Sequence, residues 1–220
     1  IINMSFGCGH IDFENPPEPG EEGYADYLEA LEVRDAIVYA AGQGCIIVAA
    51  AGNSGAVGLD FPASMPETIS VGSIDYDYSR SYYTAMAATD EYLDVVTPGE
   101  YDMIVGVATT HLLDMTTWAS WRSWGIDCYL GQDAYAYVNG TSFSCPQVSG
   151  LAALYRAIRP DCTLEEFRTA IQTTGFDLGA SGYDSEYGWG LLNAAGALEY
   201  GENIPEPVTG GIIASLLFSA

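Results

Sequence analysis

Basic side chains are scarce in this chain of 220 residues, which has 6 Lys and Arg against 30 Asp and Glu and a formal net charge of −24. Without a basic surface to neutralise phosphates, the chain is not expected to bind nucleic acid. The same deficit argues against binding to an anionic membrane surface. We interpret the acidic excess as a solvated surface. Calcium ligation is the alternative use of so many carboxylates, but no EF-hand spacing places a site.

Histidine is nearly absent, and cysteine lacks the spacing of a metal site. The chain has 2 His and 5 Cys, and none of the cysteines forms a CxxC pair. A zinc site is therefore not expected. The odd number of cysteines leaves at least one thiol unpaired. Cys45 opens the apolar run CIIVAAAGN and is interpreted as a small buried hydrophobic residue.

The chain also lacks an initiator Met and a secretory signal, since it opens directly on the apolar segment IINMSFG. Such a segment is typical of the middle of a domain, so we expect it to lie inside a longer protein. No apolar run approaches the ~20 residues that a membrane-spanning helix needs.

Apolar segments with different periods alternate along the chain. Short runs bounded by glycine predict strands, and CIIVAAA is a continuous run of the kind found in parallel strands covered on both faces. Longer stretches with helical spacing lie between them, and Thr163 with Glu166 forms a capping-box pattern. The alternation predicts an α/β fold with a largely parallel sheet. We expect strands at 1–6, 45–51, 68–74, 92–99 and 103–108, and helices at 24–43, 141–158, 163–173 and 190–200.

The segment NGTSFSCPQVSG, residues 139–150, places Ser142 where the helix over 141–158 would begin. The first N–H groups of a helix have no internal partner and favour negative charge, so an oxyanion forming beside Ser142 would be stabilised there. Gly140 would let a substrate approach the backbone closely. The alternative is an ordinary serine that caps the helix.

The segment VAAAGNSG, residues 48–55, ends a predicted buried strand with Asn53 in a glycine-flanked turn. Ligands of open parallel sheets gather at the carboxyl ends of the strands, and an asparagine amide there can donate to a developing oxyanion. The alternative is a turn asparagine that adopts left-handed geometry.

Together these segments resemble the subtilase family, the subtilisin-like serine proteases. NGTSFSCPQVSG resembles the family's serine motif, VAAAGNSG its oxyanion segment and INMSFG its substrate-binding strand. FPASMPETISVGSID, DVVTPG and YGWGLLNAAGAL follow in the family's order. Phe143 and Gln147 depart from the usual Met and His of the serine motif. The segment between TPG and NGTS is longer than usual and contains Trp118, Trp121 and Trp124, which suit either a helix face packed on the core or an aromatic wall beside a groove.

The resemblance implies a three-layer α/β fold that is incomplete at its N-terminus. It implies that Ser142 is the nucleophile and that Asn53 and the Ser142 N–H donate to the oxyanion. Polypeptide substrates would pair with an extended strand and meet one wall of the specificity pocket, with broad specificity expected. No cofactor is implied for catalysis, and structural calcium stays possible without an assigned site. The resemblance assigns the substrate-pairing strand to Ser5, Phe6 and Gly7. It assigns the wall of the specificity pocket to Ala50, Ala51 and Gly52.

Serine needs a base and an orienting carboxylate, and in subtilases both precede the nucleophile in the chain. Neither His10 nor His111 lies in a segment that resembles the family's histidine motif. We therefore expect the catalytic Asp and His upstream of this chain. The alternative is a non-catalytic peptide-binding or structural domain with a subtilase-like fold.

The last residues, GENIPEPVTGGIIASLLFSA, differ in composition from the rest. They resemble the start of a PEP-CTERM sorting signal, in which a Pro-Glu-Pro motif precedes an apolar helix and a basic cluster. The predicted division is a peptidase portion at 1–200 and a linker with a truncated sorting segment at 201–220. The resemblance implies an exported, extracytoplasmic or surface-associated protein of a Gram-negative bacterium, with membrane contact only through this tail. A polar linker with an apolar end is the alternative.

Overall fold

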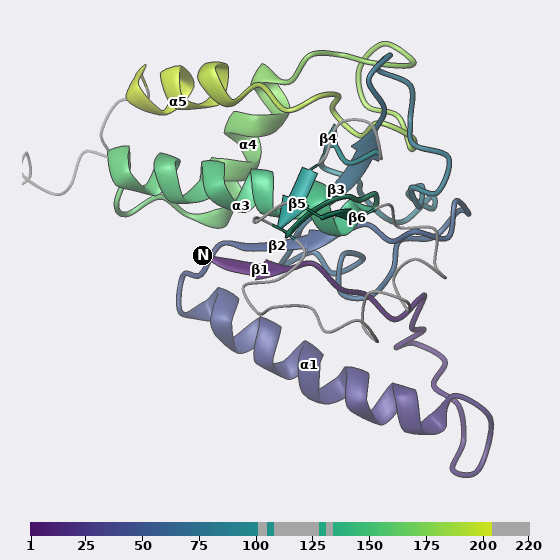
Figure 1. Ribbon diagram of the computed structural model, residues 1–220. Coiled ribbons are helices and arrows are strands. Elements are labelled where there is room, and N and C mark those ends of the chain that lie inside the picture. Colours follow the sequence, from purple (N-terminus) through teal and green to yellow (C-terminus); the bar gives the residue numbers. More distant parts are fainter. Residues whose placement is uncertain (101–104, 108–127, 131–133, 204–220) are drawn as a thin grey trace, which may run out of the picture.

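The centre of the computed structural model, which describes residues 1–100, 105–107, 128–130 and 134–203, is a four-stranded parallel sheet (Figure 1). Its strands lie in the order β1-β2-β3-β4, and every neighbouring pair runs parallel. Val48 lies opposite Asn3 on one side and Ile69 on the other, which fixes the register of the central strands. The strands are β1 (Ile2–Met4), β2 (Ile47–Ala50), β3 (Ile69–Ile74) and β4 (Val95–Pro98).

Helices cover both faces of this sheet, which confirms the predicted α/β architecture (Figure 1). Helix α1 (Tyr24–Gly42) lies on one face. Helices α3 (Thr141–Ile158), α4 (Leu164–Thr174) and α5 (Ala194–Asn203) lie on the other. The capping box predicted at Thr163 is present, with the Glu166 N–H donating to Thr163 Oγ1 at 3.1 Å and the Thr163 N–H donating to Glu166 Oε2 at 2.9 Å.

Strand β2 explains why the run CIIVAAA has no polar residue. Val48 and Ala50 point to the core formed with α3, α4 and α5, whereas Ile47 and Ala49 point to the core on the side of α1. All four side chains are almost fully buried. A strand covered on both faces must be apolar at every position, since its side chains alternate between the two faces. Cys45, just before this strand, is only half-buried beside the α1 core.

A second, smaller sheet is antiparallel and has the order β5-β7-β6. The strand predicted at 103–108 is found as β5, but it pairs with β7 in this sheet and not with the parallel one. A short apolar run indicates a strand without specifying its partner, which only the fold decides. The three strands are β5 (Val105–Val107), β6 (Cys128–Leu130) and β7 (Ala134–Tyr137).

The prediction that the last helix begins at residue 190 is wrong, since α5 begins at Ala194. Gly190 has a φ of +96°, and Leu191 forms isolated bridges with Val96 and Phe176, so this part is extended. Asn193 Oδ1 accepts the N–H of Gly196 at 3.0 Å and thereby caps the helix.

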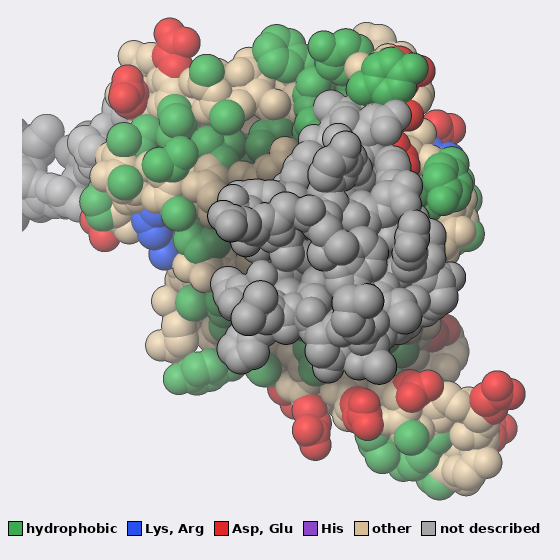
Figure 2. Space-filling view, in the orientation of Figure 1, with side chains coloured by type: hydrophobic (Ala, Val, Ile, Leu, Met, Phe, Trp, Pro, Cys, Tyr) green, Lys and Arg blue, Asp and Glu red, His purple; other side chains and the backbone are tan. Residues whose placement is uncertain are grey.

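Acidic side chains are distributed over both ends of the face shown in Figure 2, whereas basic side chains are few on it. None of the helices in the described part of the chain is long and apolar enough to cross a membrane. The three tryptophans discussed above, Trp118, Trp121 and Trp124, lie outside the described residues.

Candidate active site

Ser142 is the second residue of α3, so its hydroxyl lies in the first turn of the helix. The residue that caps the helix is Gly140, with a φ of 132° and no side-chain cap bond, and Thr141 follows it. The interpretation of Ser142 as an ordinary capping serine is therefore wrong. Its backbone N–H belongs to the first turn, where the helix itself supplies no acceptor.

Asn53 lies directly beside this turn, in the loop that follows β2. Its Oδ1 accepts two hydrogen bonds from Thr141, from the N–H and from Oγ1, each at 3.0 Å. These bonds orient the amide and leave Nδ2 as the group that can donate to an incoming oxygen. Thr141, which directly precedes Ser142, thus connects Asn53 to the first turn of α3.

The Ser142 hydroxyl donates to the carbonyl oxygen of Ser5 at 3.0 Å. Ser5 follows β1, so the helix that carries the hydroxyl contacts the segment predicted to pair with a peptide. Phe6 is 56% exposed and Gly7 is also exposed. This segment is therefore accessible next to Ser142.

The predicted pocket wall has two different parts. Ala50 packs into the core beside α3, and Ala51 packs into the core beside α1, so both methyl groups face the protein interior. The N–H of Gly52 donates to Thr141 Oγ1 at 3.3 Å, which joins the end of the wall to the first turn of α3. A wall at this place would be made of backbone and of Gly52, not of the alanine side chains.

A polar cluster around Tyr83, next to the first turn of α3, was not predicted from the sequence. Tyr83 Oη donates to the carbonyl of Gly99 at 2.5 Å and accepts the N–H of Gly140 at 2.9 Å. Burial raises the pKa of the Tyr83 hydroxyl, so it stays neutral and can donate. No motif marks Tyr83, because its partners lie far away in the sequence.

The two sides of α3 are fixed to neighbouring strands. Gln147 Nε2 donates to the carbonyl of Pro98 at 2.6 Å, so the residue that replaces the family's usual His holds the helix to the end of β4. Asn3 Oδ1 in β1 accepts from Ser149 Oγ at 2.8 Å and from Cys145 Sγ at 3.2 Å. Burial raises the pKa of the Cys145 thiol to about 11, which makes it a protonated, structural group.

His10 is not placed as a base for Ser142 in the described part of the chain. His10 Nδ1 lies 3.7 Å from a carboxylate oxygen of Glu91, and the Ser142 hydroxyl bonds to Ser5 instead. His111 lies outside the described residues.

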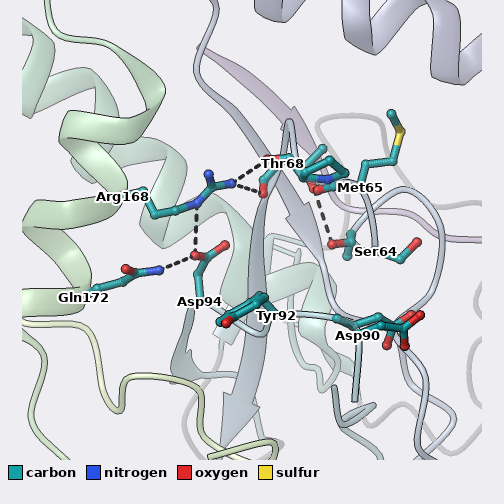
Figure 3. Close-up of a pocket in the computed structure, with 11 residues that line it drawn as sticks. Ser64, Met65, Thr68, Asp90, Tyr92, Asp94, Arg168 and Gln172 are labelled. Carbon is teal, nitrogen blue, oxygen red and sulfur yellow. Dashed lines mark hydrogen bonds and ion pairs between the residues drawn. The ribbon is translucent and has the colours of Figure 1, made fainter. Parts of the chain in front are cut away.

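A separate pocket of about 380 Å³ is lined by Arg168 and Gln172 of α4, by Asp94 and by the turn around Thr68 (Figure 3). Arg168 Nε lies 3.1 Å from Asp94 Oδ1, and Gln172 Nε2 donates to the same oxygen at 2.7 Å. Arg168 also donates to the carbonyl of Thr68 at 2.7 Å. Burial raises the pKa of the Asp94 carboxyl while Arg168 opposes this. These groups satisfy one another, so this cluster connects α4 to the sheet.

Groups of three or more His, Cys, Asp or Glu side chains arranged to hold a metal ion do not occur among the residues that the structure describes. The possibility of structural calcium therefore stays a prediction without an assigned site.

The sequence and the fold are similar to those of known proteins. The model of the subtilase family matches residues 1–190. Subtilisin DY of Bacillus licheniformis is 30% identical over 203 residues, which cover 90% of this chain and 57% of that protein. Subtilisin BL of Lederbergia lenta is 32% identical over 165 residues, covering 75% of this chain and 50% of that protein. The chain thus spans about half the length of these relatives.

A crystal structure of a lanthipeptide protease has the same fold, with a TM-score of 0.67. It is 23% identical in sequence, and the match covers 90% of this chain and 60% of that one.

Proposed function

Since the chain belongs to the subtilase family, we propose that it carries the nucleophile and the oxyanion-binding groups of a serine endopeptidase. The observation that supports this most directly is the contact between the first turn of α3 and the amide of Asn53. This contact supports the proposal because acyl transfer requires a hydroxyl, a backbone N–H and a side-chain amide to act on one carbonyl group.

In the proposed reaction Ser142 Oγ attacks the carbonyl carbon of the scissile peptide bond and forms a tetrahedral intermediate. Its proton passes to a histidine base, and the negative oxygen is bound by Asn53 Nδ2 and the Ser142 N–H. The C–N bond then breaks, the base returns the proton to the leaving amine, and water hydrolyses the acyl-enzyme. Ser142 first has to give up its hydrogen bond to the Ser5 carbonyl.

The base and its orienting aspartate would come from a part of the protein that precedes this chain, in the order Asp, His and Ser. A polypeptide substrate would pair with Ser5, Phe6 and Gly7, where main-chain hydrogen bonds supply affinity. The exposure of Phe6 and Gly7 supports this placement. The wall that includes Ala50, Ala51 and Gly52 would contact a substrate side chain. No cofactor is needed for this chemistry.

The proposal includes the division of the chain and its location. Residues 1–200 would form the peptidase portion, and residues 201–220 a linker and the start of a PEP-CTERM-like sorting segment in an exported protein of a Gram-negative bacterium. Only this tail would contact a membrane. Detecting the protein in the extracytoplasmic fraction, and its loss from there on deletion of 204–220, which leaves α5 intact, would test this part.

A fluorophosphonate probe tests the catalytic proposal, because it labels only an activated serine. The full-length gene product should be labelled, and Ser142→Ala should abolish labelling. Ser54→Ala is the matched control: Ser54 is exposed one residue after Asn53, and its hydroxyl only accepts the N–H of Ala56. An unlabelled full-length protein that still binds peptides would instead favour the non-catalytic domain.

A further inference from the structure

The carboxylate of Asp60 lies between the two segments that would form the specificity pocket. A Cβ placed on Gly52 would lie 2.5 Å from Asp60 Cγ, and a Cβ placed on Gly7 would lie 2.8 Å from Asp60 Cβ. Gly52 ends the candidate wall, and Gly7 ends the candidate peptide-binding strand. The same acidic side chain therefore touches the backbone of both segments.

Backbone hydrogen bonds hold Asp60 at this place. Its N–H donates to the carbonyl of Ala51 at 2.9 Å, and the next residue, Phe61, donates to the carbonyl of Gly9 at 2.8 Å. The carbonyl of Phe61 in turn accepts the N–H of Cys8 at 3.1 Å. Residues 60–61 are thus attached to both the segment that follows β1 and the loop that follows β2.

The charge of Asp60 has no cationic partner among the residues that the structure describes. Burial raises the pKa of its carboxyl, and only the backbone of Gly9 opposes this. The five described arginines all have other contacts: Arg34 with Asp35, Arg80 with Glu186, Arg159 with Glu166, Arg168 with Asp94, and Arg156 with the carbonyls of Gly44 and Cys162. A half-buried carboxylate of this kind favours a cation that arrives from outside.

The position of Asp60 relative to Ser142 identifies the source of this cation. Gly52, which the carboxylate touches, donates its N–H to Thr141, the neighbour of Ser142. In the proposed binding mode, with the peptide along residues 5–7 and its scissile carbonyl at Ser142, the side chain before the scissile bond would lie on the side of Gly52 and Asp60. Lysine and arginine carry their charge at the end of a long apolar stem, so a charged end could reach a carboxylate that lies between Gly7 and Gly52.

We propose that Asp60 is the specificity-determining residue of the pocket and selects substrates with Lys or Arg immediately before the scissile bond. The inference rests on the proposed peptidase function, and it narrows the broad specificity expected from the sequence. Two other roles compete with this one: Asp60 could line a pocket that is polar but uncharged, or Asp60 could have only a structural role.

The first experiment compares two fluorogenic peptides that differ only in having Arg or Phe before the cleaved bond, using the full-length gene product. The wild type should prefer Arg, and Asp60→Asn should lower kcat/KM for the Arg peptide by roughly 10- to 100-fold, so that the ratio of the Arg to the Phe value falls by a similar factor. Asp161→Asn removes the same charge from an exposed turn and should change neither value. An equal loss for both peptides in Asp60→Asn, or a wild type that prefers Phe, would overturn the proposal.

The second experiment separates this proposal from the peptidase function. p-Aminobenzamidine is a cationic probe whose binding needs no catalysis, so it is titrated into the full-length Ser142→Ala variant with and without Asp60→Asn. If p-aminobenzamidine binding depends on Asp60 but the fluorophosphonate does not label the wild type, the pocket is supported and the peptidase function is contradicted. Labelling without benzamidine binding would support the peptidase and overturn the role of Asp60.

Discussion

Thr141→Val is the most direct test of how the site is held together. Thr141 is fully buried, and valine has nearly its shape, so the change removes the hydroxyl with little change in packing. That hydroxyl donates to Asn53 Oδ1 at 3.0 Å and accepts the N–H of Gly52 at 3.3 Å. Valine leaves the buried N–H of Gly52 without a partner.

The two lost hydrogen bonds do not cost the same. An unsatisfied buried donor costs about 1–3 kcal/mol, whereas Asn53 is exposed and can replace its lost donor with water. We therefore expect the free energy of unfolding to fall by about 1–3 kcal/mol, seen as a lower urea midpoint with an unchanged m-value. The Thr141 N–H still holds Asn53, so fluorophosphonate labelling should fall by less than the ~10²–10³ that follows loss of an oxyanion donor.

Thr141→Ser is the matched control, because it keeps the hydroxyl and loses only a methyl group. It should stay closer to the wild type than the valine variant does in both measurements. If the valine variant matches the wild type in its urea midpoint, or if serine is as destabilising as valine, the hydroxyl does not connect the two segments and the description of the site is wrong.

Three further predictions concern stability. Arg168→Met should lower the free energy of unfolding by about 3–5 kcal/mol, because it leaves the buried Asp94 carboxylate without its cation. The control, Arg34→Met, breaks an exposed ion pair and should cost below about 1 kcal/mol, and urea unfolding compares the two variants. Gly52→Ala should destabilise by about 1–3 kcal/mol in thermal unfolding, since its φ is +114° and its Cβ would meet Asp60, whereas Gly150→Ala, with open space in a helix, should stabilise by about 0.5–1 kcal/mol. Burial raises the pKa of Asp60 above its unfolded value, so its ionisation favours unfolding: Asp60→Asn should be more stable than the wild type at neutral pH, with a difference that shrinks as the pH falls through that raised pKa. Urea titrations at several pH values would show the opposite trend, or none, if the carboxylate were stabilised in the fold.

Local patterns in the sequence were sufficient to predict much of the fold. The helix predicted over 141–158 has these bounds in the structure, and its end is marked locally by Pro160. The capping box at Thr163 and the apolar run of β2 are local too, since each depends on residues a few positions apart. Features of this kind are visible in a sequence before any partner is known.

Features that depend on partners far away in the sequence could not be predicted. The start of α5 was placed too early, because the capping role of Asn193 is recognised only once Leu191 is seen to bridge to Phe176 and Val96. The pairing of β5 depends on β7, about 30 residues later. Asp60 and Tyr83 contribute to the site through contacts with glycines that are neighbours only in space.

The bonds from Asn3 to Cys145 and Ser149 mean that β1 and α3 cannot shift independently of each other. A peptide bound along residues 5–7 and the hydroxyl that would attack it are therefore carried by two elements that are hydrogen-bonded to each other. The loop over residues 10–23, by contrast, supplies neither these bonds nor the backbone bonds of Cys8 and Gly9 to Phe61. Replacing that loop with one of another length should change which peptides are admitted while preserving their alignment with Ser142, which makes it a natural place to vary selectivity.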